Sequence, residues 1–239
     1  MTTALLSAIY FYGNHSTAWA YINQHQRVNH LDKSQFNRRL LRLQAPLWAI
    51  FRAVGQTLKE LNTEARYLID SFPVVVCDNI RIRGCRLFQQ EAHRGYSASK
   101  RRYFYGFRVQ VITTEEGLPV DFHIYAGSFV DVTALQAMPL DLPPGSELYA
   151  DSGYTDYELE DLMADCDQVR LLAVRKSNAK RGDDPATAFL KKHYRRRIET
   201  VFSQIKAHFP AKIHAVTPEG YLLKVTLFVM AFTFDQLST

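Results

Sequence analysis

The stretch Pro73-Val-Val-Val-Cys-Asp78 is a short β-branched run that ends in a carboxylate. A run of this composition predicts a buried β-strand. A second run, Ser146-Glu-Leu-Tyr-Ala-Asp151, also reads as a strand and also ends in an aspartate. Because ligand sites commonly form where strands end at the rim of an α/β sheet, Asp78 and Asp151 are candidate site residues.

The residues around these two runs alternate between strand and helix patterns. Residues 104–113 and 120–125 alternate as strands do, with a turn at 115–119 between them. Further along we predict a helix, a strand and two longer helices, at residues 154–166, 168–174, 186–209 and 218–237. This succession predicts an α/β domain with a mixed sheet flanked by helices.

The first seventy residues have a helical pattern. From residue 36 to residue 61 apolar side chains recur every three or four positions, which is typical of one helix face. Ser34 is the predicted N-cap, and Pro46 is expected to divide the segment because proline suits the first turn of a helix. We therefore predict a helical N-terminal region at 1–70, followed by the α/β domain at 71–239.

The net charge, the cysteines and the longest apolar stretch limit the kinds of partner and compartment that the sequence suggests. The 239 residues carry 29 Lys and Arg against 24 Asp and Glu, a net charge of +5 that permits a polyanionic partner without requiring one. Three cysteines without a CxxC pair argue against a disulfide framework or a zinc cluster and favour the cytoplasm. The longest apolar stretch, 221–234, contains Lys224 and is short for a membrane span, so we expect a buried helix and no membrane partner.

The charges are strongly segregated along the chain. No Lys or Arg occurs between Arg108 and Arg170, an interval that holds thirteen acids. Residues 81–108 carry eight basic residues against one acid, and residues 168–197 carry ten against two. Each run alone is compatible with solvated surface. Together they suggest a basic binding surface around a site that contains carboxylates.

A third carboxylate, Glu199, lies in the helix predicted at 186–209. At about 100° per residue, Lys206 lies about 20° from Glu199 around the helix and Arg195 about 40° from it. The three side chains therefore share one face, an acid between two cations. A salt-bridged surface helix explains the same pattern, because Arg195 and Glu199 form an ordinary i,i+4 pair.

Three carboxylates that converge on one site repel each other unless a cation neutralises them. A set of oxygen ligands without His or Cys suits Mg²⁺ or Mn²⁺ rather than Zn²⁺. Two such ions activate a water or a 3′-hydroxyl and stabilise the leaving oxygen in phosphodiester cleavage or transfer. Basic residues near the metals would then hold the DNA backbone.

Several stretches together carry a family resemblance. They are SFPVVVCDNIRIRG around Asp78, KRRYFYGFRV from Lys100, ADSGYTDYELEDL around Asp151, HYRRRIETVFSQIK around Glu199 and KIHAVTPEGYLLKV near the C-terminus. With them the chain resembles the DDE-type insertion-sequence transposases, most closely the bacterial group numbered nine-eighty-two. The resemblance implies an RNase H-like core with a catalytic, metal-binding triad of Asp78, Asp151 and Glu199 and two Mg²⁺ or Mn²⁺ ions.

The chain differs from the family pattern in two places. Arg195, Glu199 and Lys206 fit the spacing of the tyrosine-arginine-glutamate-lysine signature of related transposases, but Lys192 stands where the tyrosine is expected. We therefore leave the neighbouring Tyr194 out of the catalytic set. Full members of the group carry a longer N-terminal region, and we expect this chain to begin inside it.

Candidate DNA contacts lie in both basic segments and on the Glu199 helix just beyond the second one. They are Lys100, Arg101, Arg102, Arg175, Lys176, Asn178, Arg195 and Lys206. The mixture of cations and aromatics at 100–105 suits contact with the backbone and stacking on unpaired bases. An amphipathic strand explains that mixture equally well. Asp131 and Asp156 are set aside as a helix N-cap and a first-turn acid.

These observations predict an insertion-sequence transposase that cleaves DNA at the ends of its element and transfers the strand. Its partners would be double-stranded DNA, at the terminal inverted repeats and the target, and a second copy of the chain in a homodimer on DNA. Its expected location is the bacterial cytoplasm, at the nucleoid. A non-enzymatic DNA-binding remnant and a stand-alone RNase H-like nuclease are the alternatives.

Overall fold

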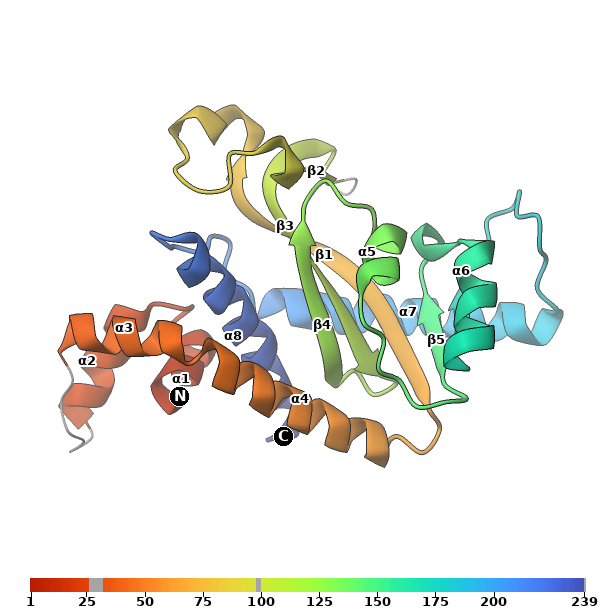
Figure 1. Cartoon of the computed structure of the whole chain (residues 1–239), viewed down its shortest axis with the longest axis horizontal. Coiled ribbons are helices and arrows are strands. Elements are labelled where there is room, and N and C mark those ends of the chain that lie inside the picture. Colours follow the sequence, from red (N-terminus) through yellow and green to blue (C-terminus); the bar gives the residue numbers. More distant parts are fainter. Residues whose placement is uncertain (26–31, 98–99, 239) are drawn as a thin grey trace. The chain divides into compact units, whose positions relative to one another are not determined.

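The computed structural model describes residues 1–25, 32–97 and 100–238. It contains two compact units, residues 54–204 and residues 1–53 together with 205–239 (Figure 1). This division differs from the predicted boundary at residue 70. The C-terminal helix groups with the N-terminal helices, and the sheet unit already begins within the fourth helix.

The unit at 54–204 is built on a six-stranded mixed sheet (Figure 1). Its strands are β1 Arg66–Asp78, β2 Arg94–Ser97, β3 Arg102–Thr114, β4 Pro119–Ala126, β5 Glu147–Ala150 and β6 Arg170–Ala173. The order is β2-β3-β1-β5-β6, and β4 also pairs with β3. β3 is antiparallel to β1, β2 and β4, whereas β1, β5 and β6 run parallel. This mixed sheet confirms the predicted α/β, RNase H-like fold class.

Helices cover both faces of the sheet. On one face lie α5 (Asp131–Ala137) and α6 (Tyr157–Leu162), together with the last two turns of α4 (Gln44–Leu61). Their apolar side chains pack with alternate residues of β1 and β5 into a buried core. On the other face α7 (Pro185–Ala207) passes behind the strands in Figure 1. Its Tyr194 lies against Tyr149 of β5, with ring centroids 4.1 Å apart, and Phe202 lies 6.5 Å from Phe72 of β1.

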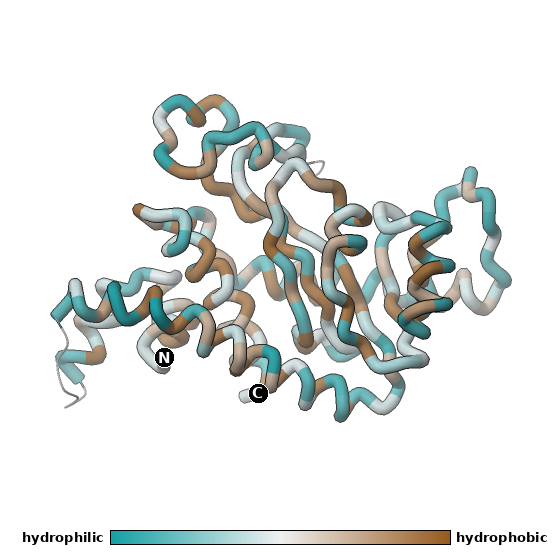
Figure 2. Tube along the Cα trace, in the orientation of Figure 1, coloured by the Kyte–Doolittle hydropathy of each residue, from teal (hydrophilic) through white to brown (hydrophobic). Residues whose placement is uncertain are grey.

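Short helical turns complete this unit. Three 3-10 turns occur at Asn79–Gly84 (η1), Glu91–His93 (η2) and Ser152–Tyr154 (η3), and a π-helical turn follows α6 at Met163–Asp167 (η4). The loop at 174–184, between β6 and α7, is mainly hydrophilic and stands out in teal in Figure 2. The helix predicted at 154–166 is thus not one regular α-helix: its residues belong to the end of η3, to α6 and to η4.

β1 begins earlier than the sequence pattern suggested. The helical part ends at Leu61, and β1 extends over thirteen residues from Arg66, inside the region predicted as helical. Residues 67–69 are fully buried, so this part of β1 lies in the centre of the sheet. Because β1 starts at Arg66, Asp70 lies on the central strand of the sheet.

The helical unit contains α1 (Thr2–Tyr10), α2 (His15–His25), α3 (Lys33–Arg42), the first part of α4 and α8 (Pro218–Leu237). α3 is capped by Asp32, whose carboxylate accepts the Gln35 N–H at 2.8 Å, so the prediction of Ser34 as the cap was wrong. Pro46 lies in the first turn of α4, as predicted. α1 and α3 pack against α8.

α8 is the apolar helix expected at the C-terminus. Its length and composition would allow it to cross a membrane, and 61% of its apolar window is buried within the protein. The core helix of a folded domain has the same properties. Eleven of its residues, from Tyr221 to Thr233, are buried, which matches the predicted buried helix.

Candidate carboxylate site

The sheet brings Asp70 and Asp151 side by side. β1 and β5 pair in parallel from Arg66 with Glu147 to Ile69 with Ala150, and the next residue on each strand is an aspartate. Neighbouring strands lie about 4.8 Å apart, so the two Cα atoms are close neighbours. Side chains alternate along a strand, which places Asp70 on the same face as Phe72 and Asp151 on the same face as Tyr149. Both carboxylates therefore lie on the face covered by α7.

The two aspartates have the same local geometry. Asp70 Oδ1 accepts the Ser71 N–H at 2.7 Å, and Asp151 Oδ1 accepts the Ser152 N–H at 2.6 Å. Both residues are partly exposed. A backbone N–H that donates to one oxygen fixes the orientation of the carboxylate, while other lone pairs stay available to a ligand. The Asp-Ser pair that follows an apolar run at both Asp70 and Asp151 is the sequence signal that could have identified Asp70.

Asp78 does not belong to this pair. It lies eight residues beyond Asp70 on β1, roughly 26 Å along an extended strand. A bulge between Val75 and Cys77 intervenes, and Asp78 pairs with Phe104 of β3 rather than with β5. Its carboxylate lies 3.3 Å from Arg102 Nη1. The structure thus contradicts the expected meeting of Asp78 with Asp151 and offers Asp70 in its place.

Glu199 lies on the flank of α7 opposite to Arg197. On the opposite flank, about 160° around the helix, Arg197 donates to the carbonyls of Glu115 and Glu116 in the β3–β4 turn. That turn lies beside the start of β1, because Thr114 pairs with Tyr67. Glu199 therefore lies on the side of α7 away from the β3–β4 turn and the start of β1.

The helix face predicted around Glu199 is present. Arg195 Nε lies 3.4 Å from Glu199 Oε1, and the Glu199 side chain is 67% exposed. Lys206 is exposed on the same face. Tyr194, left out of the catalytic set, is buried against β5.

The chemistry of the candidate ligands indicates which metal ions they would bind. Asp70, Asp151 and Glu199 offer only carboxylate oxygens, which suit Mg²⁺ and Mn²⁺. Among the described residues, no three His, Cys, Asp or Glu side chains are gathered closely enough to hold a metal ion in this conformation. Two of the candidate carboxylates lie on adjacent strand positions, and the third, Glu199, lies on a flank of α7.

The predicted DNA contacts fall into two groups. Lys100, Arg101 and Arg102 are exposed at the β2–β3 hairpin. Tyr103 is also exposed there and lies opposite Tyr96, with ring centroids 5.1 Å apart. The hairpin therefore presents cations and aromatic rings on its surface.

The second group lies in the 174–184 loop and contains one exception. Lys176 and Asn178 are exposed in this loop. Arg175 is only 14% exposed, and its guanidinium binds both Glu160 oxygens at 2.6 Å. It also lies 3.7 Å from Asp183. Because both terminal nitrogens of the guanidinium bind Glu160 and the side chain is mostly buried, Arg175 is not a DNA contact in this arrangement.

The structure reverses the roles predicted for Asp131 and Asp156 at the helix N-termini. Asp156 is the N-cap of α6 and accepts the N–H groups of Glu158 and Leu159. Asp131 is the first residue of α5, after the cap residue Val130, and makes no cap bond with its side chain. Instead its carboxylate is hydrogen-bonded to neighbouring strands. The prediction for Asp131 was wrong because its partners lie far away in sequence.

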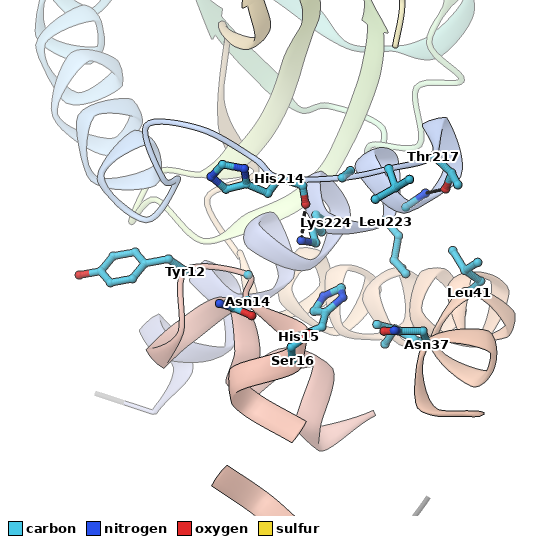
Figure 3. Close-up of a pocket in the computed structure, with 15 residues that line it drawn as sticks. Tyr12, Asn14, His15, Ser16, Asn37, Leu41, His214, Thr217, Leu223 and Lys224 are labelled. Atoms are coloured by element: carbon cyan, nitrogen blue, oxygen red, sulfur yellow. Dashed lines mark hydrogen bonds between the residues drawn. The ribbon is translucent and has the colours of Figure 1, made fainter. Parts of the chain in front are cut away.

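The helical unit contains a separate pocket of about 480 Å³ (Figure 3). His15 and Lys224 line it, and Lys224 Nζ donates to the His214 carbonyl at 2.5 Å. Burial, aided by the charge of Lys224, lowers the pKa of His15 to about 4, so this imidazole is neutral at pH 7. The pocket has no carboxylate among its lining residues and is not a second metal site.

The order and directions of the strands define an RNase H-like fold. The family model described as transposase DDE domain matches residues 61–214, well over half of the chain and a span that includes Asp70, Asp151 and Glu199. The chain therefore belongs to the transposase DDE domain family. No curated protein and no solved structure matches it significantly.

Proposed function

We propose that the protein is an insertion-sequence transposase that cuts DNA at the ends of its own element and joins those ends to target DNA. The observation that carries the proposal is the adjacency of Asp70 and Asp151 on the central strands. Family membership supports a nuclease of the transposase type. The resemblance to the nine-eighty-two group supports the choice of element ends as substrate.

Asp70, Asp151 and Glu199 would together hold two Mg²⁺ or Mn²⁺ ions. When bound, such ions activate the attacking oxygen and stabilise the leaving oxygen of a phosphodiester. The chain itself orients two of the ligands through the N–H groups of Ser71 and Ser152. α7 then has to bring Glu199 in from its exposed position on the helix flank.

Two reactions use the same site. In the first, water attacks the phosphate at the element end, a P–O bond breaks and a 3′-hydroxyl is released. In the second, this hydroxyl attacks a target phosphate and the 3′ oxygen of the target strand leaves. Arg195 and Lys206, on the Glu199 face of α7, would hold the negatively charged strand near the cut.

The surface that binds DNA outside the site would include the β2–β3 hairpin. Arg81, Arg83 and Arg86 are exposed in and after η1, next in sequence to the end of β1. Lys100 and Arg101 are exposed at the hairpin itself. Such a cluster suits the phosphates of duplex DNA, which supply most of the affinity of nucleic-acid binding. The exposed Tyr96 and Tyr103 add faces on which an unpaired base can stack.

Transposition requires two element ends to be held together, so we propose a homodimer on DNA. Action on the bacterial chromosome places the protein in the cytoplasm, at the nucleoid. Lys176 and Asn178 on the loop before α7 remain proposed DNA contacts.

The test uses the full chain, a duplex that ends in the element's terminal repeat, and a plasmid target. With Mg²⁺ we expect a nick at the element end and a covalent product joined to the plasmid, and neither product with a chelator. DNA binding without metal-dependent cutting would favour the non-enzymatic remnant. Cutting without joining would favour a stand-alone nuclease.

Arg175 and Lys176 provide a matched test of the DNA surface. Lys176→Gln should lower the slope of log affinity against log salt by about one phosphate contact. Arg175→Gln should leave that slope unchanged and lower the free energy of unfolding by about 3 kcal/mol, because it leaves the buried Glu160 unpaired. The measurements are DNA binding across a salt series and urea unfolding. A reduced slope in Arg175→Gln with unchanged stability would contradict our assignment.

A further inference from the structure

The carboxylate of Asp131 accepts hydrogen bonds from three strands. Its Oδ1 accepts the Ser71 hydroxyl of β1 at 2.5 Å and the Tyr125 hydroxyl of β4 at 2.7 Å. Arg108 Nη1 of β3 lies 3.3 Å from the same oxygen and compensates its charge. A carboxylate with three donors on one oxygen is held rigidly.

The first of these bonds leads to Asp70. Ser71 carries the backbone N–H that orients the Asp70 carboxylate. Because successive side chains alternate between faces, the Ser71 hydroxyl points to the α5 face while Asp70 points to the α7 face. A bond from Asp131 to the Ser71 hydroxyl therefore fixes the residue that orients Asp70, from the opposite side of the sheet.

A second route leads to Asp151. The buried Gln110 side chain donates to the main-chain carbonyl of Asp131 at 3.2 Å and to the Tyr154 hydroxyl at 3.1 Å. Tyr154 ends the turn η3, which begins directly after Asp151, and its N–H donates to the Asp151 carbonyl. The same turn supplies the Ser152 N–H that orients the Asp151 carboxylate.

The charges around Asp131 favour an orienting role over metal binding. Burial and the negative charge of Asp131 raise the pKa of Tyr125, so the hydroxyl keeps its proton and donates it to Asp131. Burial raises the pKa of Tyr154 as well, with additional effects from Asp131 and Asp70. Asp131 Oδ1 is thus filled by donors, and Asp131 lies on the face away from the Asp70 carboxylate.

We propose that Asp131 is a positioning residue for both proposed metal ligands. Its carboxylate orients Asp70 through Ser71, and its main-chain carbonyl supports, through Gln110 and Tyr154, the turn that orients Asp151. The inference rests on the proposed role of Asp70 and Asp151 as metal ligands. Groups that orient metal ligands in this way contribute about 10–100-fold to metal affinity or activity.

The experiment measures Mn²⁺ binding to the full chain by electron paramagnetic resonance, without DNA. Asp131→Ala and Ser71→Ala both remove the bond between the Ser71 hydroxyl and the Asp131 carboxylate, which is the route to Asp70, and should each weaken Mn²⁺ binding about 10-fold or more. Asp131→Asn keeps an oxygen that accepts the Ser71 and Tyr125 hydroxyls and should restore affinity to within about 3-fold of the wild type. Ser71→Ala keeps the test valid if Asp131→Ala does not fold.

Asp156→Ala is the matched control, since the Asp156 carboxylate caps α6 and accepts from Gln136, and none of these partners lies on the routes to Asp70 or Asp151. It should lower the urea midpoint and leave Mn²⁺ affinity unchanged. The inference is overturned if Asp131→Ala and Ser71→Ala bind Mn²⁺ like the wild type, if Asp156→Ala weakens binding equally, or if the wild type binds none. Wild-type Mn²⁺ binding without DNA cleavage would remove the proposed function and leave the inference standing.

Discussion

Asp70→Asn is expected to lower metal-dependent cleavage of element-end DNA by about 1000-fold. The substitution keeps the shape of the side chain but removes one of the two adjacent carboxylates. Loss of metal-assisted charge stabilisation costs several kcal/mol of activation free energy, and each 1.4 kcal/mol is tenfold in rate. The measurement is the rate of nicking of a labelled duplex under single-turnover conditions.

Asp78→Asn is the control for this prediction. Asp78 lies at the far end of β1, where it pairs with Arg102, so its loss should change the nicking rate by less than about 3-fold. If Asp70→Asn cut DNA normally and Asp78→Asn were inactive, the triad would contain Asp78, as the sequence predicted. The assignment of Asp70 from the register of the sheet would then be wrong.

Gly106→Ala is expected to destabilise the sheet unit by roughly 3 kcal/mol, the upper end of the cost of overpacking a core. Gly106 of β3 pairs with Val75 of β1. A Cβ at this position would lie 2.3 Å from the Val74 carbonyl oxygen and 3.0 Å from the Val76 nitrogen. Both contacts are backbone atoms, so the two central strands would have to separate beside the bulge in β1.

Gly84→Ala is the matched control because nothing lies within 4 Å of a Cβ added there. It should change the free energy of unfolding by less than about 0.5 kcal/mol. Both values come from urea unfolding followed by circular dichroism. Equal stability of the two variants would show that β3 does not approach β1 as closely as described.

The strands and the long helices could be predicted from the sequence because their apolar patterns are local. The stripe of apolar residues on α7 correctly placed Glu199 beside the buried face of that helix. β1 was harder, since residues 66–72 mix charged, aromatic and aliphatic side chains and precede a proline. The β-branched run after Pro73 alone predicts a short strand, so the local pattern places Asp70 in the helical region.

Long-range partners account for the remaining differences. The choice between Asp70 and Asp78 depends on the register of β1 against β5, which pairs residues about eighty positions apart. Arg175 is held by Glu160, fifteen residues earlier, and Asp131 by Ser71, sixty residues earlier. A basic loop residue and a first-turn acid carry no local sign of such partners.

The assignment of Asp70 and Asp151 as metal ligands is tested most directly by mapping which residues lie beside a bound metal. Fe²⁺ in place of Mg²⁺, with ascorbate and peroxide, generates radicals that cut the backbone beside the metal. We expect fragments that end near residues 70 and 151, suppressed by excess Mg²⁺ and absent from Asp70→Asn. Fragments that end near residue 78, or cuts that Mg²⁺ does not suppress, would contradict the assignment of Asp70 and Asp151 as the metal-binding pair.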